Sequence, residues 1–425
     1  MEHITYIGHV DGDSFFASCE VARFPHLRNT AVVIGQERGI VTALTAEAKA
    51  LGIQRGDSLY KIRNDYKNVT ILPANFELYK QYAKNLAIIL RQYCDVVETY
   101  SIDECFFEIS FQKNTHPHTI KTWLGDLQTY IHKQLGITYS LGLSTSKTLA
   151  KVASKMNKPC GCEVLITQHD VQCILKKTSV SDIWGVGRQF NKKLLAYGIA
   201  TAYDFVHVPP GFLQTLGSPA PLRDTQQELQ GVQRLPVSNK RDVNDHQSMQ
   251  STRMLVFHTT QTDIIFSELS RHVEILSMRM VREGLVAKKI AWFVRVSDAA
   301  KGHRAWFESD LPTATANPSL IMNTIKKCHI FSLADGEVYK GTGISAVGLV
   351  HESYSQQDLF EESVEYLHDD VSKLLCGVKD KFGSHVIMLA SSQASFDIRS
   401  NERERHIQSA HYITGLPFPY LGEVV

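Results

Sequence analysis

Two short acidic runs carry the clearest chemical signal in this sequence, because each stands at the end of an apolar stretch. Asp103 and Glu104 lie between Val96-Val97 and the apolar run at residues 105–109. Such β-branched and aromatic runs predict two strands that meet at a tight turn, with the acids at its edge. A further strand is predicted over residues 4–11, and it ends on Asp11.

Pairing of these strands would bring together the carboxylates of Asp11, Asp103 and Glu104. Close carboxylates repel one another unless a cation neutralises them. Hard oxygen ligands suit Mg²⁺ that bridges to the phosphates of a substrate. The pattern therefore predicts a two-metal site for in-line phosphoryl transfer. The alternative is a polar hairpin turn, where Asp is common because its side chain hydrogen-bonds the local backbone.

The complete pattern decides between these interpretations. It reads Asp-x-Asp-x-Phe-Phe-Ala-x-x-Glu at residues 11–20 and Ser-Ile-Asp-Glu at residues 101–104. With both parts, the sequence resembles the Y-family, the translesion DNA polymerases. It is most similar to the UmuC branch, which includes the catalytic subunit of DNA polymerase V and its plasmid-borne relatives. The resemblance covers nearly the whole chain.

The resemblance implies the metal ligands. Asp11, Asp103, Glu104 and the carbonyl of Gly12 would hold two Mg²⁺ ions. Asp13 matches a family position that is not a metal ligand.

The residues that follow imply a nucleotide site. The backbone amides of Ser14 and Phe15 would contact the triphosphate, as amides at a helix start suit phosphates. Phe16 matches the steric gate, an aromatic ring that leaves no room for a ribose 2′-hydroxyl. Without the motif, an ordinary core aromatic would explain Phe16.

Two lysines would also reach the triphosphate. The helix predicted over Thr45–Leu51 and closed by Gly52 carries Ala46 and Lys49, where many Y-family members have Tyr and Arg. The UmuC branch resembles this sequence at both positions. Lys49 would meet a phosphate as a point charge, and its alternative is a solvated helix lysine. Lys158 matches a family lysine that binds the triphosphate.

A basic stripe precedes Lys158. The helix predicted over residues 146–156 places Lys147, Lys151 and Lys155 at steps of four. Such a stripe is usually a solvated face. In the family, however, the pattern Ser-x-x-Lys-x-x-Ala-Lys-x-Ala-Ser also occurs at this place.

Composition and length set wider limits. A chain of 425 residues exceeds a single hydrophobic core, so several domains are expected. Lys and Arg total 45 against 44 for Asp and Glu, so only local patches can indicate nucleic acid. The sequence predicts no signal peptide, no membrane partner and a cytoplasmic protein. The 8 cysteines lack zinc spacing and are interpreted as reduced, mostly buried thiols.

The predicted fold class is α+β, in a multidomain right-hand polymerase. Strands and helices in the order β, α, β, β, α, β predict a ferredoxin-like palm, an order that polymerases share with nucleotidyl cyclases. The resemblance implies a palm at 1–19 and 76–175, small fingers at 20–75, a helix-hairpin-helix thumb at 176–235, a linker at 236–250, an α+β little finger at 251–350 and a C-terminal extension at 351–425. Within these, strands are predicted at 31–34, 39–43 and 386–389, and helices at 262–283 and from 75 to 93.

Contacts with primer-template DNA are predicted from glycines and cations. Gly185, Gly187 and Arg188 belong to a Gly-Val-Gly loop, whose amides can approach a DNA phosphate without reading sequence. Arg253 is one of several cations in the predicted little finger, where binding to the DNA backbone would depend on salt concentration.

A partner peptide follows the predicted little finger. Gln356, Leu359 and Phe360 form Gln-x-Asp-Leu-Phe, which resembles the sliding-clamp peptide and suits a hydrophobic groove. In the UmuC branch, the extension beyond it meets a UmuD′-like protein and RecA. The sequence thus predicts an error-prone DNA polymerase of the SOS response that uses deoxynucleoside triphosphates. The alternatives are a nucleotidyl cyclase on the same palm and a DNA- or clamp-binding scaffold without catalysis.

Overall fold

A five-stranded sheet carries the acidic residues. Its strand order is β5-β6-β1-β7-β8. The bounds are β1 (His3–Gly12), β5 (Val96–Thr99), β6 (Glu104–Gln112), β7 (Tyr139–Ser144) and β8 (Cys162–Leu165). The central strand β1 pairs antiparallel with β6 and with β7. The predicted alternation of strands and helices is present, and β8 adds a parallel edge strand that the prediction did not include.

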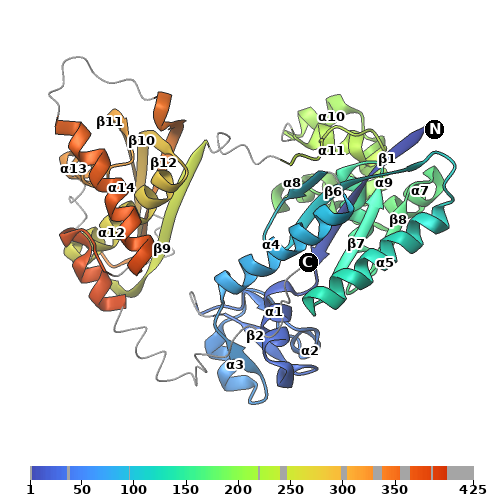
Figure 1. Cartoon of the computed structure of the whole chain (residues 1–425), viewed down its shortest axis with the longest axis horizontal. Coiled ribbons are helices and arrows are strands. Elements are labelled where there is room, and N and C mark those ends of the chain that lie inside the picture. The colour runs from blue at the N-terminus through green and yellow to red at the C-terminus, as the bar shows by residue number, and fades with distance from the viewer. Residues whose placement is uncertain are drawn as a thin grey trace. The chain divides into compact units, whose positions relative to one another are not determined.

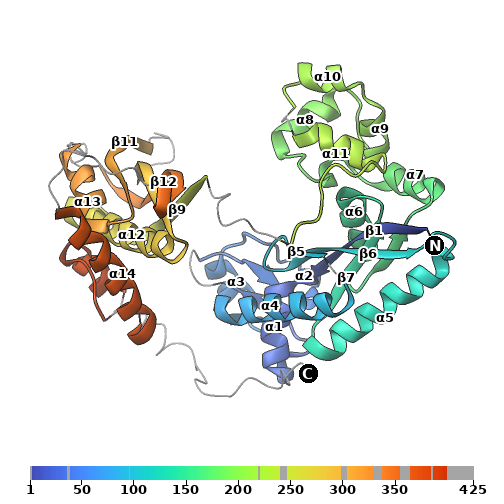
Figure 2. The same cartoon turned by 45° about the horizontal axis from the view of Figure 1, so that its top comes forward.

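Helices cover both faces of this sheet (Figures 1 and 2). One face packs against α4 (Phe76–Tyr93) and α5 (Pro117–Leu135), whose apolar stripes supply the largest hydrophobic cluster. The other face receives α6 (Lys147–Lys155), which contacts β1, β7 and β8. Because strand residues alternate between faces, β1 sends Val10 to the apolar core and Ile7 to the α6 side.

The computed structural model describes residues 2–35, 39–94, 96–218, 221–239, 247–297, 304–328, 337–354, 364–383 and 386–399. Two compact units are present, one within residues 1–241 and the other within residues 242–415. The predicted clamp peptide with Gln356, Leu359 and Phe360, and residues 400–425, lie outside the described residues.

A small subdomain is inserted between α1 (Phe15–Arg23) and α4. It comprises β2 (Val32–Ile34), β3 (Ala43–Leu44), α2 (Ala46–Ala50), α3 (Leu59–Asp65) and β4 (Thr70–Leu72), after the short 3₁₀ turn at Pro25–Leu27. Its three-stranded sheet has the order β3-β2-β4. The strand predicted at 39–43 is wrong over most of its length, because Ile40 makes only an isolated bridge to Ser58.

A helical subdomain follows β8. Its elements are α7 (Gln168–Lys177), a 3₁₀ turn at Val180–Asp182, α8 (Arg188–Ala196), α9 (Ala202–His207), α10 (Pro210–Thr215) and α11 (Pro221–Leu229). The chain then returns to the first sheet. The side chain of Asn239 accepts a hydrogen bond of 2.8 Å from the backbone N–H of Val97, and Val237 is buried. The predicted linker at 236–250 is therefore too long at this end.

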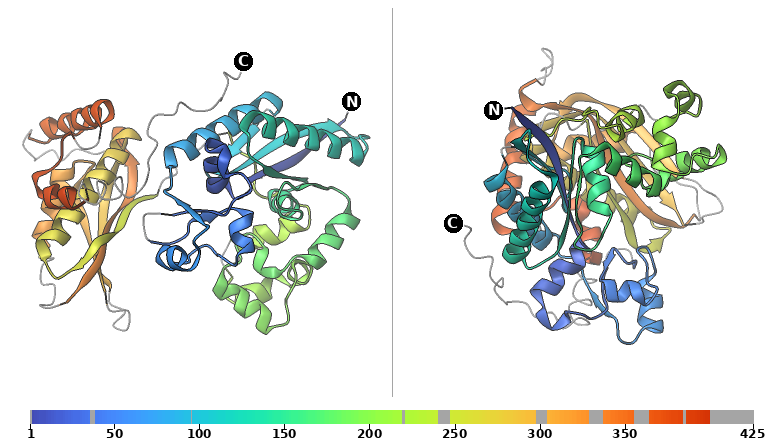
Figure 3. Two further views of the ribbon diagram at one scale, coloured as in Figure 1. Left: turned by 90° about the horizontal axis from the view of Figure 1, so that it is seen from below. Right: turned by 90° about the vertical axis from the view of Figure 1, so that its right-hand side faces the viewer.

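The second unit is a four-stranded sheet of order β11-β10-β12-β9 with helices on one face. Its elements are β9 (Ser248–Thr259), α12 (Thr262–Arg282), β10 (Leu285–Val296), β11 (Arg304–Thr315), α13 (Pro318–Lys327), β12 (Tyr339–His351), a short 3₁₀ turn at Glu352–Tyr354, and α14 (Val364–Phe382). Helices α12 and α13 pack on the sheet, and α14 packs on α12; Figure 3 shows the same unit from two further sides. Since β9 begins at Ser248, the predicted linker also ends too late.

The chain after α14 is part of this second unit. Residues 386–389 form no strand, contrary to the prediction, and a 3₁₀ turn at Ala390–Ser392 contacts α12. Arg399 pairs with Glu268 of α12, and both side chains are buried. Lys379 of α14 pairs with the buried Glu274 at 2.6 Å. The described part of the predicted extension is thus a layer on α12.

Two further expectations concern the whole chain. All eight cysteines are free thiols, but only four are buried, and Cys160, Cys173 and Cys328 are exposed. No described helix is both long enough and apolar enough to cross a membrane.

The buried pair between Arg399 and Glu268 yields a stability prediction. Burial would raise the pKa of the Glu268 carboxyl, but the hydrogen bond and charge of Arg399 outweigh burial and hold this pKa below its usual value. Arg399→Met keeps most of the stem but removes the nearest cation from a buried carboxylate, which leaves Arg271 at 3.9 Å, so we expect the free energy of unfolding to fall by about 3 kcal/mol.

The control is Arg282→Met, which breaks an ion pair with Asp380 whose two side chains are each 49% exposed. Its expected cost is much smaller, because solvent screens an exposed ion pair. Because the pKa of Glu268 is lowered in the folded state, the difference should be present above about pH 4.3 and fade as the pH falls further. Urea unfolding of the full chain measures both variants. Equal losses would contradict a buried, stabilising role for Arg399.

Candidate active site

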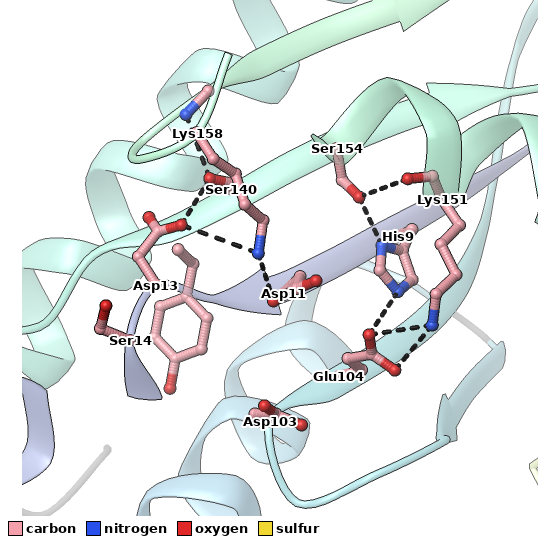
Figure 4. A network of polar contacts seen from close by, with 12 residues as sticks. His9, Asp11, Asp13, Ser14, Asp103, Glu104, Ser140, Lys151, Ser154 and Lys158 are labelled. Carbon is pink, nitrogen blue, oxygen red and sulfur yellow. Dashed lines mark hydrogen bonds and ion pairs between the residues drawn. The ribbon is translucent and has the colours of Figure 1, made fainter. Parts of the chain in front are cut away.

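The pairing of β1 with β6 places the acidic residues at one end of the sheet (Figure 4). Asp11 is the register partner of Glu104. The backbone N–H of Gly12 donates to the carbonyl of Asp103 at 3.0 Å, which fixes the turn that carries Asp103. All three acids therefore come from adjacent backbone positions, although more than ninety residues separate Asp11 from the other two in sequence.

Each of these carboxylates has its own partner. Lys158 Nζ lies 2.5 Å from Asp11 Oδ1. Lys151 Nζ lies 2.9 Å from both carboxylate oxygens of Glu104, and Asp103 accepts the hydroxyl of Ser101 at 2.5 Å. Among the described residues, no three Asp, Glu, His or Cys side chains converge tightly enough to form a metal site. In this arrangement, the ammonium groups of Lys158 and Lys151 balance the charges of Asp11 and Glu104.

The electrostatics of Asp11 favour additional positive charge. Burial raises the pKa of Asp11, and the charges of Glu104 and Asp103 raise it further, while Lys158 opposes both effects without cancelling them. A divalent cation would stabilise the ionised form of this carboxyl.

The basic stripe of α6 is not the solvated face that such stripes usually form. Lys147 and Lys151 are buried, and Lys155 is exposed. Lys147 pairs with Glu98 of β5 at 2.6 Å, so both buried lysines neutralise acids of the sheet. A spacing of four does not distinguish a solvated stripe from one that faces acidic strand ends, so the sequence showed the stripe but not the acids with which Lys147 and Lys151 pair.

His9 is a second residue that the sequence did not single out. Its fully buried ring contacts the Ser154 hydroxyl through Nδ1 at 2.7 Å, and Nε2 lies 4.0 Å from Glu104 Oε1. Burial, reinforced by the charges of Lys151 and other nearby lysines, lowers the pKa of His9 well below its usual value. His9 is therefore neutral near pH 7. The sequence feature that could have identified His9 is its position two residues before Asp11, which places both side chains on the same face of β1.

Asp13 is buried and holds the loop that carries Lys158. Its two carboxylate oxygens accept the Ser140 hydroxyl and the Cys160 backbone N–H, each at 2.8 Å. Lys158 Nζ lies 3.9 Å away. The side chain of Asp13 thus points to the Lys158 loop and not to the other acids.

The start of α1 and the lysine of α2 lie together. Ser14, with φ of 48°, precedes α1 and leaves its first amides without a side-chain cap. Lys49 Nζ donates to the Ser14 hydroxyl at 3.1 Å. A hollow of about 520 Å³ opens beside Ser14 and Ala46 and includes Pro159. Exposed amides and a lysine at a helix start are groups that bind phosphate.

The two adjacent phenylalanines have different surroundings. Phe15 is 4% exposed and packs in the main core. Phe16 is partly exposed and stacks on Tyr79, with ring centroids 4.4 Å apart and planes inclined by 11°. Phe76 meets Phe16 edge-on. Phe16 is therefore held by two neighbouring rings and keeps part of its surface exposed.

The predicted DNA contacts come from the helical subdomain and from the second unit. Gly185, Gly187 and Arg188 are exposed, and φ of 92° at Gly185 is a backbone conformation that favours glycine. The element before this loop is a 3₁₀ turn and not the predicted short helix. Arg253 lies in the second unit, two residues after Ser251, which contacts His272 of α12. By the strand alternation, Arg253 belongs to the helix-covered face of its sheet, where its charge contributes to lowering the pKa of His272.

The donor set fits Mg²⁺ in its chemistry. Asp11, Asp103 and Glu104 offer carboxylate oxygens and Gly12 a carbonyl oxygen, with no thiol or imidazole in the set.

Comparison with known proteins agrees with this fold. Residues 10–155 match the model of the impB/mucB/samB family, and residues 246–359 match that of its C-terminal domain. The chain is 26% identical to DNA polymerase IV 1 of Bacillus subtilis over 391 residues, which cover 90% of this chain and 91% of that protein. It is 30% identical to DNA polymerase IV of Streptococcus pyogenes serotype M1 over 297 residues, which cover 68% and 80%.

A solved structure gives the same result for the fold. The Y-family DNA polymerase chimera Dbh-Dpo4(243-245)-Dbh superposes with a TM-score of 0.68 at 18% identity, over 81% of this chain and 99% of that one.

The fold and the acidic strand ends define a polymerase that transfers nucleotides. The chain belongs to the impB/mucB/samB family and is a Y-family, DNA-directed DNA polymerase. Family membership decides against the cyclase alternative. The relatives named above are DNA polymerase IV proteins, so they support the family and not the UmuC branch.

Proposed function

We propose that this polymerase performs error-prone translesion synthesis by two-metal nucleotidyl transfer. The observation that carries the proposal is the register of Asp11 opposite Glu104, with Asp103 in the adjoining turn. Asp11, Asp103, Glu104 and the Gly12 carbonyl would hold two Mg²⁺ ions. When bound, such ions lower the pKa of the primer 3′-hydroxyl and stabilise the charge that develops on the phosphates.

The surrounding residues would bind and orient the nucleotide. Lys158 lies next to Asp11 and would bind the triphosphate. Lys49 and the backbone amides of Ser14 and Phe15 would bind the triphosphate as well. Phe16 would face the sugar. These groups supply positioning and electrostatic stabilisation, which account for most catalysis in phosphoryl transfer.

We assign the parts of the hand by the family resemblance. The five-stranded sheet is the palm (1–19 and 76–175), the inserted subdomain the fingers (20–75), the helical subdomain the thumb (176–235) and the second unit the little finger. Gly185, Gly187 and Arg188 would hold a DNA phosphate in the thumb. Arg253 would act in the little finger, where its half-buried place argues for a supporting role rather than a direct phosphate contact.

We further propose that the protein works in the SOS response as a UmuC-like polymerase. Ala46 and Lys49, in place of Tyr and Arg, support this branch. The proposed partners are a sliding clamp at Gln356, Leu359 and Phe360, a UmuD′-like protein and RecA.

Substitution of the acids tests the metal assignment. Asp103→Asn and Glu104→Gln should each lower nucleotide incorporation by several orders of magnitude, because each ligand supplies several kcal/mol and about 1.4 kcal/mol is tenfold in rate. Primer-template affinity should stay nearly unchanged. Single-turnover extension and fluorescence anisotropy measure the two quantities. Wild-type extension by either variant would remove that residue from the metal site.

Sugar choice tests the position of Phe16. Phe16→Ala should raise ribonucleotide incorporation relative to deoxynucleotide incorporation by at least about tenfold, or ~1.4 kcal/mol, because a 2′-hydroxyl no longer meets an apolar ring. The control is Phe15→Leu, since Phe15 lies in the core and should affect both sugars together. Single-nucleotide insertion on one primer-template measures the ratio of ribonucleotide to deoxynucleotide incorporation for each variant. A shift caused by Phe15→Leu instead would show that the assigned positions are wrong.

Bypass of damage tests the translesion proposal and its branch. On a template with one abasic site, the enzyme should insert a nucleotide opposite the lesion. If the protein is UmuC-like, a UmuD′-like protein and activated RecA should increase bypass at least about tenfold, equivalent to ~1.4 kcal/mol. The same assay on undamaged template is the control. Bypass that is independent of both partners would support a DNA polymerase IV-like enzyme, and arrest at the lesion would contradict the translesion proposal.

A further inference from the structure

Lys151 occupies a cage built from one carboxylate and two aromatic rings. Its ammonium is 2.9 Å from both oxygens of Glu104. The same Nζ lies 4.9 Å from the centroid of the Tyr100 ring and 5.5 Å from that of Trp184. The Lys151 side chain is 11% exposed. Aromatic faces attract cations, more strongly where water is excluded, so the rings complement the carboxylate.

Trp184 brings the thumb loop into this cage. It directly precedes Gly185, the first glycine of the exposed Gly185–Gly187 loop. Its ring stacks on Phe106, with centroids 5.9 Å apart and planes inclined by 24°, and meets Tyr100 edge-on at 5.4 Å. Phe106 lies two residues after Glu104 in β6, on the same face of the sheet.

The cage restricts a side chain that is otherwise flexible. A lysine has a long stem and a point charge without preferred directions, so the ammonium alone does not fix the carboxylate it neutralises. Contacts with Tyr100 and Trp184 confine the ammonium on the sides that Glu104 leaves open.

We propose that Trp184 and Tyr100 are positioning residues that hold Lys151 against Glu104 and thereby couple the DNA-binding loop to a metal ligand. The inference rests on the proposed roles of Glu104 and of the Gly185–Gly187 loop. Its consequence is that Glu104 keeps its orientation only while the loop is packed on β6. The position of DNA bound by the loop relative to the metal ligands then stays constant.

The first test measures how well Lys151 is shielded, and it needs no activity. The full-length protein is treated with an acetylating reagent, and the modification rate of each lysine is measured by mass spectrometry. Trp184→Ala should increase acetylation of Lys151 by about fivefold, the factor expected for the loss of one cation–π contact. Lys147 is the internal control, because its partner Glu98 and the ring of Phe106 remain.

Matched variants separate the cage from general packing. Trp184→Phe should retain most of the shielding, and Tyr100→Leu should expose Lys151 by removing the other ring. Val186→Ala, in the same loop but packed into the thumb core, should leave Lys151 as shielded as in the wild type. If Trp184→Ala exposes Lys147 and Lys151 equally, the ring only holds the subdomains together and the proposal is overturned.

The second test measures coupling. Trp184→Ala should lower the incorporation rate of the bound complex about tenfold, while primer-template affinity in EDTA changes by less than about twofold. Added to Lys151→Met, Trp184→Ala should cost less than about twofold more, since the link is already cut. Fully additive losses would overturn the proposal. A wild-type protein that does not extend primers would instead contradict the proposed function and leave the shielding result standing.

Discussion

The register between β1 and β6 is the constraint on which the site depends. It sets Asp11 opposite Glu104 and Gly8 opposite Phe107. A Cβ on Gly8 would lie 2.0 Å from Phe107 Cζ, so the ring of Phe107 fills the space that any side chain at this position would need. A slip of one residue would set Phe107 against a residue with a Cβ and would move Asp11 away from Glu104. The glycine and the ring thus fix the pairing that assembles the acids.

The second constraint is charge. Acids brought together by this register must be neutralised, and the chain supplies lysines from one helix and the loop after it. Lys147 and Lys151 lie on α6, and Lys158 lies just beyond its end. The lysines of α6 can therefore be buried against the sheet, because each buried ammonium pairs with a carboxylate. Removing one partner alone would leave an unpaired buried charge, which makes the lysines and acids interdependent.

Local patterns predicted much of the fold, since the strand alternation and the 3.6-residue period leave direct traces in sequence. The elements β1, α4 and α12 lie within a few residues of their predicted bounds. The failures have long-range causes. The run at 386–389 is apolar enough for a strand, but in the described part of the chain it pairs with none, and Leu389 contacts Glu274 of α12 instead. Similarly, the sequence around Arg399 appears irregular and charged, and only the fold places it against Glu268.

The candidate site shows the same division. Motif residues such as Asp11, Glu104 and Phe16 could be found because their types and spacing are distinctive. The contacts of His9, Lys151 and Trp184 could not be predicted, because a buried histidine, a helical lysine and a loop tryptophan each have a common structural explanation. What gives them a part in the site is contact with Glu104, directly or through one another. The candidate metal ligands are thus specified locally, whereas the residues proposed to orient them are specified only by the packing of α6 and the Gly185–Gly187 loop on one face of β6.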